Sequence, residues 1–285
     1  MIDFKSAKFL IVGLGLLGGG YARGLKKAGL HVSALDIRQG SIDYALENGI
    51  IDDGSIYDMS LIKNADVIIF GLYPKTMVAW ITQYQSYFKP GVLLTDVSGV
   101  KCGIIDVIQA SLRPDAEFIG VHPMAGREVS GVENSDEKIF EKANFIITPT
   151  DRNTADAIAF AEELGRILKF RHITRLPIEE HDRMIGFVSQ LTHVIAVSLM
   201  NTNDNTHLVE YTGDSFRDLT RIAKINESLW SELFLLNKDM LVQEIDDFTK
   251  ELTNFREKLV NEDLEGMKIL FMQSTARRCL FDQKS

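Results

Sequence analysis

Two short segments carry residues whose types and spacing could do chemistry. Gly13-Leu14-Gly15-Leu16-Leu17-Gly18 follows an apolar run, and His122 lies much later, within Gly120-Val121-His122-Pro123-Met124-Ala125-Gly126. A glycine-spaced turn between a strand and a helix binds the pyrophosphate of a dinucleotide. The imidazole of His122 can remove a hydroxyl proton while the carbon below it gives up hydride, because its pKa lies near working pH. Together the two segments predict an enzyme that transfers a hydride.

The glycine turn predicts how the dinucleotide is held. Gly13 permits the tight turn, Gly15 lets the pyrophosphate approach the backbone, and Gly18 allows helix and strand to pack closely. Free N–H groups at the helix N-terminus then bind the phosphates. We expect the cofactor to contact Gly13, Gly15, Leu16, Leu17 and Gly18.

Asp36 is expected to choose between the two nicotinamide dinucleotides. It ends the second expected strand, eighteen residues after Gly18, close to the usual spacing of about 20 for the acid that binds the ribose. A carboxylate there accepts hydrogen bonds from both ribose hydroxyls and repels a 2′-phosphate, which favours NAD over NADP. Arg38 is the opposing signal, since a nearby guanidinium is what NADP sites use. The alternative is that Asp36 is an ordinary turn residue.

His122 follows a strand, where the ligands of open α/β sheets bind. The preceding expected strand ends in Thr95-Asp96-Val97-Ser98-Gly99-Val100-Lys101, which could bring a hydroxyl against the imidazole. His122 and Ser98 are therefore the candidate catalytic residues. The alternative is a strand-end histidine with a structural role only.

Arg217 and Arg221 are four residues apart, on one face of an expected helix. Two guanidinium groups on one face suit a substrate with two carboxylates, since each can bind a carboxylate through two hydrogen bonds. The alternative is a solvated face on which Arg217 pairs with Asp214 or Asp218.

His193 lies in an otherwise apolar helical segment, with Ser189 one turn earlier and Gln190 beside it on the same side. It is either a buried histidine that hydrogen-bonds that serine or a polar group that lines the substrate site.

The pattern of the first part of the chain predicts an α/β fold with a doubly wound, Rossmann-type sheet. Short β-rich runs alternate with helical stretches, and several runs are almost continuously apolar, as in parallel strands covered on both faces. We assign residues 1–175 to this NAD-binding domain. The expected strands are Lys8–Val12, His31–Leu35, Val67–Phe70, Val92–Asp96, Phe118–Val121, Asn144–Thr148 and Phe170–Thr174.

Residues 176–285 contain no further strand-like run and predict an all-helical domain for substrate binding and dimerisation. Ile185–Met200 is apolar on most faces and needs cover. A later stripe is either an intrachain bundle contact or a subunit interface; its members are Leu241, Ile245, Phe248, Leu252, Phe255 and Leu259. We expect a homodimer, because about 110 residues do not readily cover both surfaces.

Composition narrows the class of protein. The chain has 285 residues and a net charge of −9, with a pI near 5.2, which argues against nucleic acid or an anionic membrane as a partner. Its two cysteines, Cys102 and Cys279, are in no metal-ligand spacing, so we expect a reduced cytoplasmic protein without a metal site. We see no signal peptide and no uninterrupted apolar stretch of the roughly 18 residues typical of a membrane span.

The chain resembles the prephenate dehydrogenase family over essentially its whole length. The two more specific matches are the His-Pro-Met-Ala-Gly and Asp-Leu-Thr-Arg-Ile-Ala segments. The matching segments are Gly13–Gly18, Asp96–Lys101, His122–Gly126, Glu128–Glu133, His181-Asp182, Val188–His193, Phe216–Ala223 and Trp230.

The resemblance implies a nucleotide-binding domain, a helical dimerisation domain and a small-molecule substrate between them. It also implies NAD-dependent oxidative decarboxylation of prephenate to 4-hydroxyphenylpyruvate, in tyrosine biosynthesis. By that resemblance His122 polarises or deprotonates the ring hydroxyl. Arg221 holds a substrate carboxylate, and Arg217 and His193 support it; Gln190 and Glu128 join the expected substrate site.

The chain departs from the family pattern at two positions. The family commonly reads Gly-Ser-Val-Lys where this chain reads Ser98-Gly99-Val100-Lys101, which leaves open whether Ser98 reaches His122. Gln190 stands where some relatives have a second histidine.

Three other functions compete with this prediction. An arogenate dehydrogenase performs the same chemistry on the aminated substrate, whose amine could pair with Glu128 or Asp218. A β-hydroxyacid dehydrogenase normally carries a lysine on the first long helix of its second domain, and Ile185–Met200 has none. A non-catalytic NAD-sensing regulator would keep Gly13–Gly18 and Asp36 but would need neither His122 nor the arginines.

Overall fold

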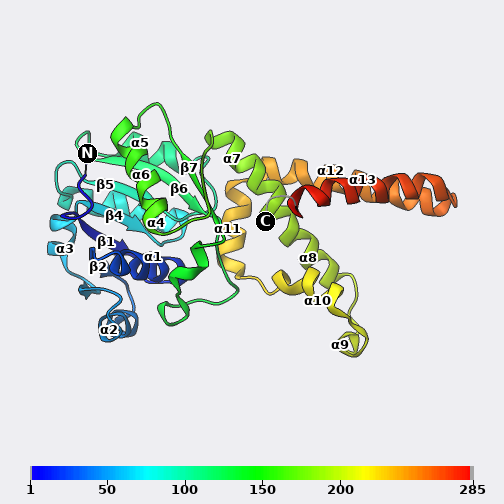
Figure 1. Ribbon diagram of the computed structural model, residues 1–285, viewed down its shortest axis with the longest axis horizontal. Coiled ribbons are helices and arrows are strands. Elements are labelled where there is room, and N and C mark those ends of the chain that lie inside the picture. The colour runs from blue at the N-terminus through cyan, green and yellow to red at the C-terminus, as the bar shows by residue number, and fades with distance from the viewer. Residues whose placement is uncertain (1, 283–285) are drawn as a thin grey trace. The chain divides into compact units, whose positions relative to one another are not determined.

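The computed structural model describes residues 2–282, which form two compact units that divide between Asn237 and Lys238. Figure 1 traces the order of the elements along the chain.

The first unit contains an eight-stranded sheet with the order β3-β2-β1-β4-β5-β6-β7-β8. All neighbouring strands are parallel except β6 and β7, which are antiparallel. The strands are β1 (Lys8–Val12), β2 (His31–Leu35), β3 (Asp53–Ser55), β4 (Val67–Phe70), β5 (Leu93–Asp96), β6 (Glu117–Pro123), β7 (Asn144–Thr148) and β8 (His172–Arg175).

The α/β fold of Rossmann type is confirmed. The expected bounds of β1, β2, β4 and β7 agree residue for residue, and those of β5, β6 and β8 shift by one or two residues. The short edge strand β3 was not predicted, because Asp53-Gly54-Ser55 contains no apolar residue.

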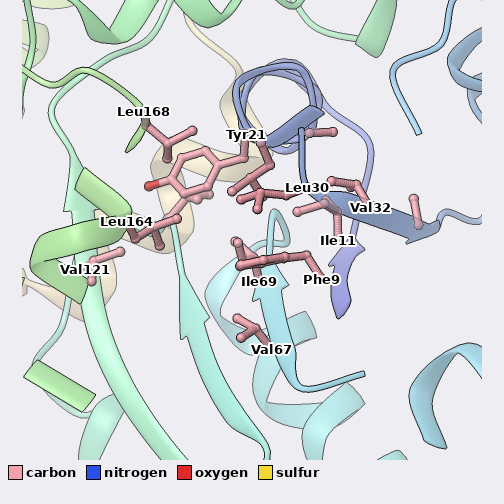
Figure 2. Packing of buried hydrophobic residues seen from close by; sticks show 14 of the residues in the cluster. Phe9, Ile11, Tyr21, Leu30, Val32, Val67, Ile69, Val121, Leu164 and Leu168 are labelled. Carbon is pink, nitrogen blue, oxygen red and sulfur yellow. The ribbon is translucent and has the colours of Figure 1, made fainter. Parts of the chain in front are cut away.

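The helices of this part of the chain cover both faces of the sheet. Successive residues of a strand point to opposite faces, so Phe9 and Ile11 belong to one buried cluster and Leu10 and Val12 to the other. Figure 2 shows part of the first cluster, with the Tyr21 ring beside Leu164 and Leu168 and with Phe9 beside Ile69. The helices are α1 (Leu16–Lys27), α2 (Gln39–Glu47), α3 (Met59–Asn64), α4 (Pro74–Tyr84), α5 (Ile105–Ser111) and α6 (Ala155–Ile167).

The antiparallel neighbour of β6 matters for the position of His122. β6 pairs with β5 through Glu117–Ile119 only. Its last four residues, Gly120–Pro123, pair with β7 instead. β6 can therefore continue past the carboxyl end of β5, and it carries His122 with it.

A long helical stretch follows the sheet within the first unit. α7 (Ile178–Ile185) continues through a π-helical turn (Gly186–Leu191) into α8 (Thr192–Asn201). By length and composition this stretch could cross a membrane, but core helices of soluble proteins pass the same test. Its residues His181 and Asp182 are buried. The elements that follow are α9 (Leu208–Tyr211), α10 (Asp214–Thr220), a 3-10 turn (Arg221–Ala223) and α11 (Glu227–Leu236).

The second unit is a hairpin of two helices, α12 (Lys238–Val260) and α13 (Leu264–Asp282). The rings of Phe255 and Phe271 lie 6.0 Å apart across it. Along the predicted stripe of α12, Leu241 is buried, whereas Phe248, Leu252 and Leu259 are exposed. The expected domain boundary at residue 176 lies just after β8. The two compact units instead divide after Asn237, so the expected boundary stays a prediction.

Candidate active site

The turn between β1 and α1 fits a dinucleotide pyrophosphate. Gly13 has φ of 97°, and a Cβ there would lie 2.7 Å from the carbonyl oxygen of Gly71. A Cβ on Gly18 would lie 2.0 Å from the carbonyl oxygen of Gly13, so both positions require glycine. At Gly15, by contrast, an added Cβ would meet nothing within 4 Å. Open space therefore adjoins the N-terminus of α1, whose N–H groups suit phosphate.

Asp36 joins the end of β2 to this turn. Its Oδ2 accepts a hydrogen bond from Leu14 N at 2.7 Å, and its Oδ1 accepts one from Arg38 N at 2.8 Å. The guanidinium Nε of Arg38 lies 3.7 Å from the same carboxylate. Asp36 thus makes the bonds of a turn residue and also presents a carboxylate beside the glycine turn.

His122 is half-buried, and it begins a chain of polar side chains that continues through the buried His181 and Asp182. Its Nδ1 lies 2.9 Å from Nε2 of His181, and Nδ1 of His181 lies 2.5 Å from Oδ1 of Asp182. Backbone N–H groups of Lys101 and Cys102 donate to the Asp182 carboxylate at 2.7 to 3.1 Å. Asn237 donates to the Asp182 carbonyl at 2.9 Å. α7 is therefore attached, through Asp182, to the segment that follows β5.

A buried ion pair holds that segment. Nζ of Lys101 lies 2.8 and 2.6 Å from the two carboxylate oxygens of Asp96, and it also donates to the carbonyl of Val121 at 2.6 Å. Lys101 is 0% and Asp96 1% exposed. Asp96 in turn accepts a hydrogen bond from Val121 N at 3.1 Å. The pair thus connects β5 to β6 immediately before His122.

The expected contact between Ser98 and His122 is not formed. The Ser98 hydroxyl donates to the Asp96 carboxylate and lies 3.2 Å from the Val100 carbonyl oxygen. Gly99 stands beside the imidazole instead: a Cβ there would lie 3.7 Å from Cε1 and Nε2 of His122. The order Ser98-Gly99 therefore directs the hydroxyl toward the ion pair and leaves a glycine opposite the histidine.

Burial and neighbouring charges lower the pKa values of His122, Asp182 and Lys101. Burial lowers the pKa of His122 well below its usual value, and His181 and the Lys101 ammonium lower it further. Burial alone would raise the pKa of Asp182, but hydrogen bonds from His181 and Cys102 N outweigh it and lower that pKa. Burial lowers the pKa of Lys101 against the opposing effect of Asp96. His122 is thus kept neutral, as a proton acceptor must be.

A second polar group involves α8, α11 and the loop after β6. His193 stacks on Trp230 with ring centroids 3.7 Å apart, and its Nδ1 donates to the carbonyl of Ser189, the expected partner residue, at 2.8 Å. Burial lowers the pKa of His193; the charge of Glu128 raises it and that of Arg221 lowers it. Arg221 donates a hydrogen bond to Glu128. His193, Arg221 and Glu128 are therefore neighbours.

α11 links the two polar groups to the sheet. Leu233, one turn after Trp230, would lie 3.9 Å from a Cβ on Gly99, which faces His122. Lys75 N, at the start of α4, donates to Glu232 at 2.7 Å, and Asn226 donates to the Tyr73 hydroxyl at 3.0 Å. α11 thus lies at the carboxyl ends of β4 and β5, where α/β sheets bind their ligands.

Arg217 and Gln190, which were expected to bind substrate, have other partners in the structure. Arg217 donates to the Thr212 carbonyl at 3.3 Å and lies 3.9 Å from Asp214, so it has the partners of a solvated face. Gln190 is 1% exposed; its amide donates to the Leu233 carbonyl at 3.1 Å and accepts from Asn237 at 2.8 Å. Gln190 attaches the π-helical turn to α11, and we do not include either residue in the substrate site.

The sequence did not single out His181 and Asp182 as site residues, nor Trp230. An adjacent histidine and aspartate near a helix start carries no recognisable spacing, since successive helical residues do not face each other. The match of His181-Asp182 to the family pattern was a sequence signal for this pair, but only the long-range contacts with His122 and Lys101 show what it does.

Two family models and several known proteins match this chain. A family model described as the nucleotide-binding domain of prephenate dehydrogenase matches residues 21–173, and one described as its dimerisation domain matches residues 177–273. The prephenate dehydrogenase of Bacillus subtilis is 31% identical over 268 residues, which are 90% of this chain and 71% of the relative.

Two further relatives bear on substrate and cofactor. The cyclohexadienyl dehydrogenase of Zymomonas mobilis is 27% identical over 94% of each chain. The solved prephenate dehydrogenase of A. aeolicus, in complex with hydroxyphenyl propionate and NAD+, has a TM-score of 0.88 and 28% identity, and covers 98% of this chain and 100% of that one.

Proposed function

The chain belongs to the prephenate dehydrogenase family, and we propose that it catalyses the NAD-dependent oxidative decarboxylation of prephenate to 4-hydroxyphenylpyruvate in tyrosine biosynthesis. The observation that carries the proposal is the position of His122. It lies beyond the carboxyl end of β5, with its ring beside Gly99 and with a pKa lowered by burial, which keeps it neutral.

The cofactor is NAD, held by the turn Gly13–Gly18 and by Asp36. The open space at Gly15 and the carboxylate beside the turn support this assignment. When bound, NAD supplies the hydride acceptor.

His122 acts on the ring hydroxyl of the substrate. The hydroxyl proton passes to Nε2 of His122, the O–H electron pair forms a ring carbonyl, and hydride leaves the same carbon. The bond between the ring and its carboxylate breaks, and its electron pair enters the ring as carbon dioxide departs. The proton returns from His122 to the oxygen, which completes an aromatic phenol.

Arg221 and His193 bind the substrate. Prephenate carries two carboxylates and no positive charge, and a guanidinium matches a planar carboxylate through two hydrogen bonds. Arg221 donates a hydrogen bond to Glu128 in this structure, so a substrate carboxylate replaces Glu128 as the partner of Arg221. His193 offers its Nε2, because Nδ1 is already bonded to Ser189, and Trp230 orients its ring.

The test is NADH formation by the purified protein with prephenate or arogenate, each with NAD or NADP. We expect prephenate with NAD to give the highest kcat/KM. Arogenate is the competing substrate, since its amine could pair with Glu128, and a higher kcat/KM with arogenate would assign the chain to that reaction. Absence of turnover with both substrates would refute the proposed function.

We further propose a cytoplasmic homodimer formed through the helical part of the chain. The match of residues 177–273 to a dimerisation domain supports it. Apolar side chains that a partner would cover are exposed; they include Phe187, Val188, Leu252, Leu259, Phe271 and Met272. Light scattering should give twice the 32.0 kDa of one chain, and a mass of one chain at micromolar concentration would refute the dimer.

A further inference from the structure

A chain of hydrogen bonds leads from His122 to His181 and Asp182, and it begins at the ring nitrogen Nδ1. Nδ1 of His122 meets His181, and His181 meets Asp182. Within residues 2–282, Nε2 of His122 has no hydrogen-bond partner and lies on the side of Gly99. His122 therefore has one nitrogen held by protein and one available for a ligand.

The protons on this chain of side chains can be assigned from Asp182 outward. The Asp182 carboxylate accepts backbone N–H bonds from Lys101 and Cys102, and its pKa is lowered, so it is ionised and only accepts. His181 therefore donates from Nδ1, and a ring that carries only this proton accepts at Nε2. His122 must then donate from Nδ1, which leaves the lone pair on Nε2.

We propose that His181 and Asp182 are positioning residues that hold His122 in the tautomer protonated at Nδ1, so that Nε2 faces the substrate as the base. The identity of the proton that Nε2 removes rests on the proposed function; the tautomer itself does not.

The opposite arrangement would disable the base. If Nε2 of His181 carried a proton, it would donate to Nδ1 of His122, and the proton of neutral His122 would move to Nε2. The charged and titratable groups that face this chain are Asp96, Lys101, Cys102 and Asp182. Because Asp96 is already paired with Lys101, the Asp182 carboxylate selects the direction of the chain.

Asp182→Asn is the sharpest variant. The asparagine Oδ1 can replace Oδ2 of Asp182 and keep the backbone N–H bonds of Lys101 and Cys102. Its amide then faces Nδ1 of His181 and donates where the carboxylate accepted. Both histidines are forced into the other tautomer, and His122 loses its lone pair at Nε2. We expect kcat to fall by about 10²–10⁴-fold, as for other histidine bases held in the wrong tautomer.

The decisive readout is the tautomer of His122, measured by nitrogen NMR on histidine-labelled protein without substrate. Wild type should show the proton on Nδ1, and Asp182→Asn should show it on Nε2. Asp66→Asn is the matched control, because Asp66 also accepts a backbone N–H, from Lys8 at 3.0 Å. It should change neither the His122 tautomer nor kcat. A wild-type proton on Nε2, or an unchanged tautomer in Asp182→Asn, would overturn the proposal.

If Asp182→Asn does not fold, a second pair of variants at His181 tests the same proposal. His181→Gln retains an amide oxygen that can accept from Nδ1 of His122, whereas His181→Phe retains ring volume and removes the acceptor. We expect His181→Gln to keep at least about tenfold more kcat than His181→Phe, with similar KM for NAD. Equal kcat in the two variants would overturn the proposal. If wild type does not turn over prephenate at all, the proposed function fails, while the NMR tautomer still decides the role of His181 and Asp182.

Discussion

The guanidinium of Arg221 donates a hydrogen bond to the carboxylate of Glu128, although ninety-three residues separate them in the chain. Arg221 starts the 3-10 turn after α10, and Glu128 lies in the loop after β6. The contact brings a cation from the helical region close to the loop that follows His122. It is the contact with which a substrate carboxylate must compete.

Arg221→Ala should therefore weaken substrate binding. Loss of a charge-assisted contact with a carboxylate should raise KM for prephenate by about 30-fold or more, with KM for NAD unchanged. Arg221→Lys should recover only part, because an ammonium cannot form the paired hydrogen bonds of a guanidinium. Arg217→Ala is the control, since Arg217 contacts Thr212 and Asp214, and its KM should stay close to wild type. An unchanged KM in Arg221→Ala would mean that the carboxylate is held elsewhere.

Asp36→Ser should relax the cofactor preference. The wild-type carboxylate repels a 2′-phosphate, and Arg38 beside it becomes available to that phosphate once the charge is removed. We expect the ratio of kcat/KM for NAD to that for NADP to fall at least about tenfold, a change of about 1.4 kcal/mol in discrimination. Comparable kcat/KM values for the two cofactors in wild type would contradict the role given to Asp36.

Lys101→Met should destabilise the fold far more than a matched surface change. It leaves the carboxylate of Asp96 buried without its partner, which costs about 3–5 kcal/mol of unfolding free energy. Lys89→Met removes a lysine from an exposed pair with Asp66 and should cost no more than about 1 kcal/mol. Urea unfolding of the two variants measures the difference. Equal midpoints would show that the buried pair contributes no more than the exposed one.

The pH dependence of kcat/KM should reflect His122. Protonated His122 cannot accept a proton, so kcat/KM falls as pH drops through its pKa. Because burial, His181 and Lys101 lower that pKa, the acid limb should lie below the usual value of about 6.5. His122→Asn should lose about 10²–10⁴-fold in kcat and lose the acid limb, with NAD affinity retained. An acid limb clearly above that value, or wild-type turnover in His122→Asn, would assign the base to another group.

Most of the sheet could be predicted from the sequence, because buried parallel strands are nearly continuous apolar runs such as Val67–Phe70. The glycine turn and the strand-end position of His122 follow from local patterns as well. β3 could not be predicted from apolar runs, since it is a polar edge strand held by β2. The antiparallel direction of β7 also has no local signal, although it determines how far β6 extends.

The candidate site was predicted less completely, because its contacts join residues far apart in the chain. His181 and Asp182 act through His122 and Lys101, which lie on other elements. Ser98 was a candidate for contact with the imidazole, but the turn after β5 directs its hydroxyl to Asp96. Gln190 was expected to bind substrate, but the buried amide of Asn237 and the Leu233 carbonyl occupy it. Side-chain direction within a loop or a π-helical turn depends on tertiary packing.

The most direct test of the proposed activity is the ratio of carbon dioxide to NADH formed by the wild-type protein from prephenate labelled in its ring carboxylate. Hydride transfer coupled to loss of that carboxylate predicts one labelled carbon dioxide for each NADH. His122→Asn should reduce the rates of both products together. NADH formed without labelled carbon dioxide would contradict oxidative decarboxylation, and formation of neither product would contradict the activity itself.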